Sequence, residues 1–155
     1  MEVDSRRAVP ADLAEVARLC SDAIGELRLN RGGAVWSQRE ARAEPLDLSL
    51  HETMVSGLLA VACIDDAIVG YAGVDLVDLH DGSVLGQVTD IYVMPEARGV
   101  GCGEALIGLV ERWCVEQGCI GIDSIALPGD RETKNFFETF GLTARALRVH
   151  RSLKN

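Results

Sequence analysis

A predicted strand runs into a predicted helix at Ile91-Tyr92-Val93-Met94-Pro95-Glu96-Ala97-Arg98-Gly99-Val100-Gly101-Cys102-Gly103-Glu104, through closely spaced glycines. At a helix start the first backbone N–H groups have no partner within the helix, and the aligned peptide dipoles add partial positive charge. Glycines at 99, 101 and 103 lack the Cβ atoms that would keep a pyrophosphate from the backbone, and Arg98 can add a charge-assisted hydrogen bond. The stretch therefore predicts a phosphate-binding loop, although glycines alone are equally compatible with a plain turn.

Two common phosphate loops do not fit this stretch. The dinucleotide fingerprint needs glycine at position 104, which is Glu104, and the P-loop needs a Gly-Lys-Ser/Thr run that is missing. Nucleotide binding of either kind is therefore excluded as the explanation for the glycines.

The stretch resembles the acyl-CoA loop of the GNAT family of N-acetyltransferases. The family pattern is Arg/Gln-x-x-Gly-x-Gly/Ala after a strand that ends in an apolar-Val-x-Pro run, and residues 98–103 match every fixed position. Further along, Asn135-Phe136-Phe137-Glu138-Thr139-Phe140-Gly141-Leu142 resembles the FYEKLGF helix end of the same family. The two motifs stand in the family's order, and the resemblance covers nearly the whole chain.

Hydrophobic periodicity predicts one α/β domain, residues 1–155, with elements in the order β-α-α-β-β-β-α-β-α-β. The predicted helices are 11–29, 37–56 with a break or a start at Pro45, 104–117 and 130–140. The predicted strands are 6–9, 58–64, 68–79, 84–94, 119–127 and a closing strand at 143–151. The resemblance implies the GNAT fold, a twisted and mostly antiparallel sheet with splayed central strands and flanking helices.

Composition favours a soluble, cytoplasmic protein. The N-terminus lacks the apolar core of a signal peptide, and the longest apolar runs are too short to span a bilayer. A net charge of −9 argues against a nucleic-acid or membrane partner, since both demand a basic surface, and suits a cationic acceptor. The five cysteines are odd in number and include no C-x-x-C pair, which argues against a disulfide framework and a structural zinc site. Cys20, Cys63, Cys114 and Cys119 are expected in the core, as is Trp113.

The resemblance implies acetyl-CoA as co-substrate, with no metal. Its pantetheine arm would pair with backbone groups of Ile91, Tyr92 and Val93, and the Val93 N–H would stabilise the oxyanion that forms when an amine attacks the thioester. The expected cofactor contacts are Ile91, Tyr92, Val93, Arg98, Gly99, Val100, Gly101, Cys102, Gly103, Asp130 and Phe137. Cys102 is expected to be a loop residue and no nucleophile, because no histidine is near it in sequence.

Two positions depart from the family pattern. Phe137 stands where relatives commonly carry the tyrosine that protonates the leaving thiolate, and a phenyl ring has no proton to give. Asp130 stands where an asparagine often contacts the cofactor. Water or another residue would then protonate the thiolate, or the site would have lost catalysis.

Asp90 is the first candidate for the general base, because it lies on the long strand shortly before Val93. The equal alternative is a strand-end carboxylate that is paired with an arginine or exposed, and His51, Glu52 and Tyr92 are weaker candidates for the base. A β-bulge in this strand would change which side chains point inward.

The resemblance implies that the acceptor is recognised by residues 28–37 and by the turn at 79–83. Arg31 and Trp36 are the candidate substrate residues, with Trp36 better explained as an aromatic that anchors its loop to the core. The acceptor would be a small-molecule or peptide amine, and the family admits a homodimer.

Two functions follow from these observations. The first is an acetyl-CoA-dependent N-acetyltransferase that moves an acetyl group to a primary amine by direct attack in a ternary complex. The alternative is a non-catalytic acyl-CoA-binding sensor or regulatory module of the same fold.

Overall fold

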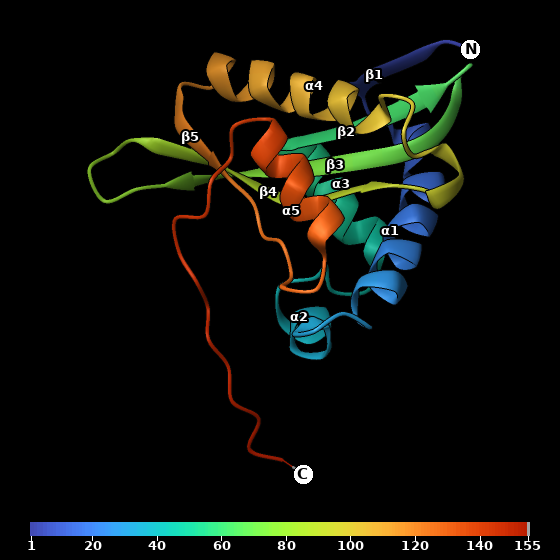
Figure 1. Cartoon of the computed structure of the whole chain (residues 1–155). Coiled ribbons are helices and arrows are strands. Elements are labelled where there is room, and N and C mark those ends of the chain that lie inside the picture. Colours follow the sequence, from blue (N-terminus) through green and yellow to red (C-terminus); the bar gives the residue numbers. More distant parts are fainter. Residues whose placement is uncertain (155) are drawn as a thin grey trace.

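A five-stranded sheet in the order β1-β2-β3-β4-β5 forms the centre of the computed structural model, which describes residues 1–154 (Figure 1). The strands are β1 Val3–Arg7, β2 Leu58–Ile64, β3 Ala67–Asp78, β4 Val84–Val93 and β5 Cys119–Asp123. Neighbouring strands are antiparallel except β4 and β5, which are parallel. The helices are α1 Leu13–Leu27, α2 Gly33–Arg39, α3 Leu46–Ser56, α4 Cys102–Glu116 and α5 Arg131–Thr139.

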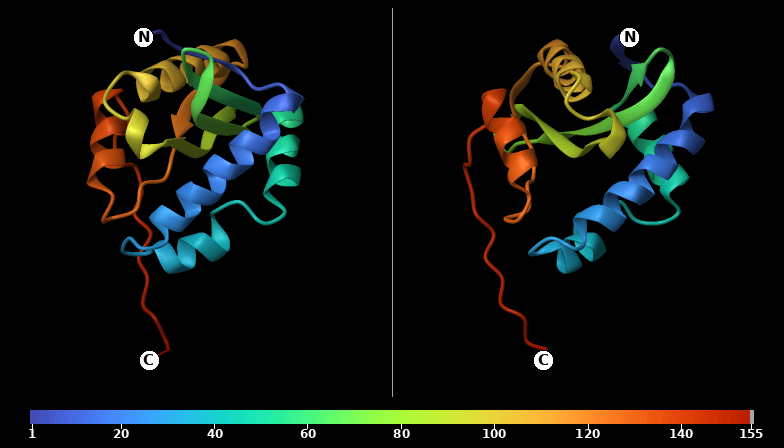
Figure 2. Two further views of the ribbon diagram at one scale, coloured as in Figure 1. Left: turned by 90° about the vertical axis from the view of Figure 1, so that its right-hand side faces the viewer. Right: turned by 45° about the vertical axis from the view of Figure 1, so that its right-hand side comes forward.

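The helices cover the two faces of the sheet and bury a hydrophobic cluster on each (Figure 2). Strand β2 supplies both clusters, since its side chains alternate between the faces. Leu58, Ala60 and Ala62 join the cluster under α4, which also holds Trp113. Leu59 and Val61 join the cluster under α1 and α3. All of these β2 side chains are buried, so a single strand connects the two halves of the core.

Strand β4 carries a bulge in its second half. Val88 lies opposite Val74 of β3 and Asp90 lies opposite Gly73, which leaves Thr89 as an extra residue. In a regular strand Val88 and Tyr92 would face the same side. Here Val88 belongs to the cluster under α4 and Tyr92 to the cluster under α1 and α3, so the bulge reverses the facing of everything after it.

Strands β4 and β5 diverge before β4 ends. Their registered pairs stop at Gln87 and Asp123, although β4 continues to Val93. Residues 88–93 of β4 therefore have a free edge, meaning the side away from β3, along which no described strand pairs. This divergence gives the splayed central strands that were expected.

Most predicted elements are present, and several of their limits are different. The first strand is Val3–Arg7, where 6–9 was predicted, and the strand predicted at 119–127 ends at Asp123. The predicted 37–56 helical stretch is two helices, and Pro45 comes directly before the second. Helix α2 begins at Gly33, inside the segment expected to be an acceptor loop.

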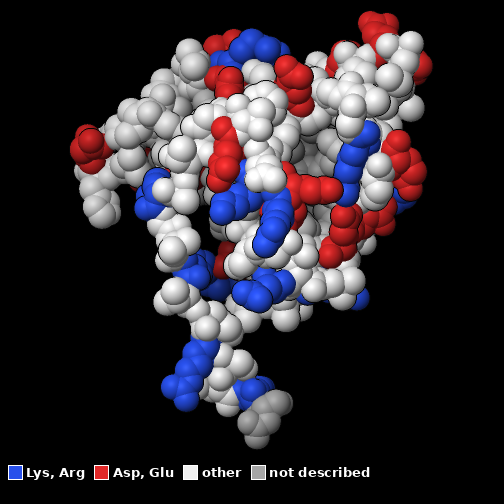
Figure 3. Space-filling model, viewed as in Figure 1, with Lys and Arg blue, Asp and Glu red and all other residues white. Residues whose placement is uncertain are grey.

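The closing strand predicted at 143–151 is wrong. Residues 143–154 have no regular secondary structure and leave the body as an exposed tail (Figures 1 and 3). Two ion pairs attach its base, Arg145 with Asp123 and Arg148 with Glu40. Leu147 and Val149 supply the alternation that predicted a strand, and they are 89% and 90% exposed because no described strand edge receives them. No helix among residues 1–154 is long and apolar enough to cross a membrane.

Candidate active site

The glycine loop places an uncapped helix start at the free edge of β4. Gly101 is the N-cap of α4 with φ 100°, and Gly99 has φ 84°, both in the left-handed region that favours glycine. A Cβ at either position would meet no atom within 4 Å, so both face open space. No side chain caps α4, whereas Asp130 caps α5 by accepting the Thr133 N–H. An external anion can therefore use the first N–H groups of α4.

The remaining loop residues are placed differently from one another. Val100 is exposed, whereas Cys102 is the first residue of α4 and its side chain is buried under the sheet. Burial raises the pKa of the Cys102 thiol, which makes it a packing residue and a poor nucleophile. Gly103 lies beneath α5, and a Cβ there would come within 2.8 Å of the Phe136 ring. Gly103 thus permits α5 to pack against α4.

Arg98 connects the loop to the sheet and to α1. Its Nε donates to the Val93 carbonyl at 2.8 Å, and its Nη2 donates to both carboxylate oxygens of Glu26 at 3.2 Å. The guanidinium also lies 5.4 Å from the centroid of the Tyr92 ring. Burial, with the hydrogen bond to Glu26, raises the pKa of Tyr92 to about 12, so its phenol is a donor and no base near neutral pH.

The backbone of Val93 faces the free edge of β4. The next N–H along the chain, that of Met94, donates to Val69 of β3 at 2.9 Å. Successive residues in a strand point their N–H groups to alternate edges, so the Val93 N–H points away from β3. The Val93 carbonyl lies on that same edge, where it meets Arg98. Tyr92 is buried and Ile91 is half-buried. A ligand along the free edge would therefore meet mainly the backbone groups of these residues.

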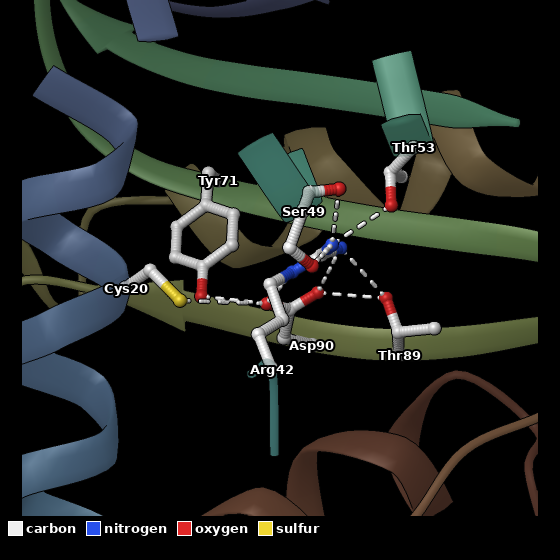
Figure 4. A network of polar contacts seen from close by, with 7 residues as sticks. All are labelled: Cys20, Arg42, Ser49, Thr53, Tyr71, Thr89 and Asp90. Carbon is white, nitrogen blue, oxygen red and sulfur yellow. Dashed lines mark hydrogen bonds and ion pairs between the residues drawn. The ribbon is translucent and has the colours of Figure 1, made fainter. Parts of the chain in front are cut away.

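Asp90 is held in a buried ion pair with Arg42 at the bulge (Figure 4). Arg42 Nε donates to Asp90 Oδ2 at 2.7 Å and Nη2 donates to Oδ1 at 2.9 Å, in a two-point geometry. Oδ2 also accepts from the Tyr71 hydroxyl at 2.8 Å, and Oδ1 accepts from the Thr89 hydroxyl at 2.7 Å. Asp90 is therefore a carboxylate paired with an arginine, which was the alternative left open by the sequence. Four hydrogen bonds occupy the lone pairs of its two oxygens, which leaves them poorly available to accept a proton from a substrate.

Arg42 was not found from the sequence. It lies in the short connection between α2 and α3, far along the chain from Asp90, and no pattern around it indicated a partner. Its remaining donors bind Thr53 Oγ1 at 2.8 Å and the Ser49 carbonyl and hydroxyl at 3.2 Å. The side chain is only 7% exposed. Together with the bonds to Asp90 and to the Thr89 hydroxyl, these contacts give an acceptor to each of the five N–H donors of the guanidinium.

A polar cavity of about 450 Å³ lies beside this network, between α3 and strands β3 and β4. Three carboxylates line it, Glu40, Glu52 and Asp75, together with four hydroxyl side chains, Leu76 and Arg42, whose charge is paired with Asp90. Partial desolvation of its carboxylate raises the pKa of Asp75, although the residue as a whole is exposed. Glu40 already pairs with Arg39 and with Arg148 of the tail. The cavity suits a ligand that is polar and positively charged.

The other candidate residues lie away from this cavity's lining. Phe137 is buried on α5, with its ring centroid 5.7 Å from that of Phe136. Asp130 caps α5 through its hydrogen bonds to Thr133, and the structure shows no further role for it. Trp36 is half-buried on α2 and Arg31 is exposed in the turn before it.

The chain is similar to known proteins over most of its length. The model of the Acetyltransferase (GNAT) family matches residues 22–142, which include the glycine loop and end directly before the tail. A curated relative, the aminoglycoside N(6')-acetyltransferase type 1 of Stenotrophomonas maltophilia, is 33% identical over 119 residues, which are 74% of this chain and 69% of that protein.

Two solved structures share the fold over nearly the whole length. Ribosomal-protein-alanine N-acetyltransferase from Brucella melitensis biovar Abortus 2308 has a TM-score of 0.72 and 18% identity, covering 99% of this chain and 100% of that one. AAC(6')-Iy in complex with the bisubstrate analogue CoA-S-monomethyl-acetylneamine has a TM-score of 0.71 and 18% identity, covering 100% of both chains. The family match and the curated relative together identify this chain as a member of the GNAT family of N-acetyltransferases.

Proposed function

We propose that this enzyme transfers an acetyl group from acetyl-CoA to a primary amine of a small, cationic acceptor. The observation that carries the proposal is the placement of an uncapped, open glycine loop at one end of the free edge of β4. The loop suits the pyrophosphate of acetyl-CoA, and the free edge suits the amide groups of its pantetheine arm. These backbone groups fit the phosphates and amides of the cofactor.

The chemistry follows from the backbone more than from side chains. With the pantetheine along β4, the Val93 N–H is the donor that polarises the thioester carbonyl and stabilises the oxyanion. Attack by the amine is direct, since Cys102 is buried and its raised pKa disfavours a thiolate. Phe137 cannot donate a proton, so solvent protonates the leaving CoA thiolate.

The acceptor binds in the polar cavity beside β3 and β4. Its carboxylates offer ion pairs to ammonium groups, and its hydroxyls offer hydrogen bonds to a polar body. The curated relative's name, an aminoglycoside acetyltransferase, makes aminoglycosides the first acceptors to try. Asp75 is the proposed general base, because it lines the cavity and its pKa is raised, whereas the oxygens of Asp90 are engaged. Asp75 lies opposite Gln87 and Val93 lies opposite Gly70, so Asp75 takes the amine proton through intervening water.

Titration calorimetry with acetyl-CoA, and with NAD as comparator, tests the cofactor. Release of the CoA thiol is then followed with kanamycin, spermidine and a peptide N-terminus as acceptors. Micromolar binding of acetyl-CoA alone, with thiol release in the presence of kanamycin or spermidine, is the expected result. Absence of acetyl-CoA binding would refute the proposal, and binding with no turnover on any amine would leave the non-catalytic alternative.

A further inference from the structure

The bulge in β4 carries a buried network of hydrogen bonds around Arg42 and Asp90. Arg42 and Asp90 are 7% and 14% exposed in their side chains and meet in a two-point ion pair. Thr89, the extra residue of the bulge, accepts from Arg42 Nη2 at 3.1 Å and donates to Asp90 Oδ1 at 2.7 Å. The hydroxyl of the bulged residue thus closes a ring of hydrogen bonds with the pair (Figure 4).

Strand β3 leaves room for this ring through a glycine. Gly73 lies opposite Asp90, and a Cβ on Gly73 would come within 2.4 Å of Arg42 Nη2 and 2.6 Å of Asp90 Oδ1. The same Cβ would come within 2.8 Å of the Thr89 hydroxyl. The three polar groups therefore occupy the space of a missing side chain, and any larger residue at 73 must displace them.

The position of the bulge decides which backbone groups face the free edge of β4. An extra residue in one strand reverses the direction of every later N–H relative to the partner strand. With Thr89 bulged, the Val93 N–H points to the free edge and the Met94 N–H points to β3. A β4 without the bulge would turn the Val93 N–H toward β3 and remove the oxyanion donor.

We propose that Arg42 and Asp90 are positioning residues, which hold the bulge at Thr89 over Gly73 so that the Val93 N–H faces the acyl group of bound acetyl-CoA. The inference rests on the proposed function. Arg42 also holds α3 through hydrogen bonds to Ser49 and Thr53, which line the acceptor cavity. One guanidinium therefore positions both the Val93 N–H at the acyl group and the α3 wall of the acceptor cavity.

The test compares the affinities for acetyl-CoA and for free CoA, because the two ligands differ only in the acyl group that Val93 would contact. Removing Arg42 or Asp90 outright risks unfolding, since it leaves a buried charge without its partner. Gly73→Ala and Thr89→Val disturb the ring without removing either charge. Gly121→Ala in β5 is the matched control, since its Cβ would meet only Leu85 at an ordinary 3.6 Å.

The wild type is expected to bind acetyl-CoA more tightly than CoA, by the contribution of one backbone hydrogen bond, roughly three- to tenfold. Gly73→Ala and Thr89→Val should lose that preference while their affinity for CoA stays within about twofold. Gly121→Ala should keep it. Such a selective loss is not produced by a merely structural role, which would weaken both ligands alike.

The other outcomes separate the two proposals. Equal weakening of both ligands, an unchanged preference in Gly73→Ala and Thr89→Val, or no preference in the wild type would each overturn the positioning role while CoA binding stands. Failure of the wild type to bind either ligand would overturn the proposed function itself. As a second measurement, Asp90→Asn is assayed once a thermal melt shows that it folds despite the unpaired Arg42. It should lower kcat and keep the shape of the pH–rate profile, and loss of the acidic limb would assign Asp90 as the base.

Discussion

Replacing Gly101 with valine tests whether the loop holds the cofactor's pyrophosphate. The folded chain has room for the new side chain, since a Cβ at Gly101 meets no atom within 4 Å. The backbone is strained instead, because φ is 100° there and a β-branched residue disfavours that region. The strain costs about 1–3 kcal/mol of stability. For a domain of this size that lowers the melting temperature by roughly 2–12 °C.

The loss of binding should be larger than the loss of stability. The side chain fills the space through which the pyrophosphate would reach the first N–H groups of α4. Losing two hydrogen bonds to a charged group costs about 1.5–3 kcal/mol each. The affinity for acetyl-CoA should therefore fall by a factor of roughly 10² to 10⁴.

Gly118→Val is the matched control. Gly118 also has a positive φ, 75°, and no neighbour within 4 Å of its Cβ, but it lies beyond the opposite end of α4. Calorimetry and thermal melts of both variants should show similar destabilisation, with the affinity for acetyl-CoA lost only in Gly101→Val. An affinity within about threefold of the wild type in Gly101→Val would refute the placement of the pyrophosphate over the loop.

Three further predictions concern the rest of the molecule. Asp12→Asn should lower the free energy of unfolding by about 1–2 kcal/mol at neutral pH, because Asp12 accepts hydrogen bonds from Arg6 and the Val9 N–H. The hydrogen bond from Arg6 lowers the pKa of Asp12 below its ordinary 3.8, so this stability is lost as pH falls through the folded-state value, and urea unfolding in strong acid should show no difference between wild type and variant. Deleting residues 143–155 should change the stability by less than about 0.5 kcal/mol, since the tail is held by exposed arginines, and a larger loss in urea unfolding would show that it packs against the body. Asp75→Asn should abolish the acidic limb of the pH–kcat/KM profile if Asp75 is the base, because a base must be deprotonated to act, and a limb that persists would exclude it.

Patterns of neighbouring residues were enough to predict those parts of the fold that form from consecutive residues. The strand-to-helix junction at the glycine loop and the apolar strand β2 were predicted from residues that are adjacent in sequence, and β2 has the predicted limits. The first strand was misplaced because Val3–Arg7 is polar at most positions and carries no alternation. The tail was misassigned because alternation reports a tendency to extend, and a strand also needs a partner edge.

The candidate site was predictable only where it depends on the backbone. Glycine spacing located the loop, and the possibility of a bulge was foreseen without its position. An arginine partner for Asp90 was one of the alternatives, but Arg42 as that partner could not be predicted, since a short connection and a strand meet only in the folded chain. The role of Gly73 was equally hidden, because it depends on what lies across the strand from it.

The two tryptophans lie in different environments, which fluorescence can tell apart. Trp113 is buried in the core cluster under α4, whereas Trp36 is half-buried on α2 and belongs to neither cluster. They are the only indoles in the chain. In a Trp113→Phe variant the remaining emission comes from Trp36 alone, so titrations with cofactor and with acceptor, in either order, would show which ligand changes the surroundings of α2.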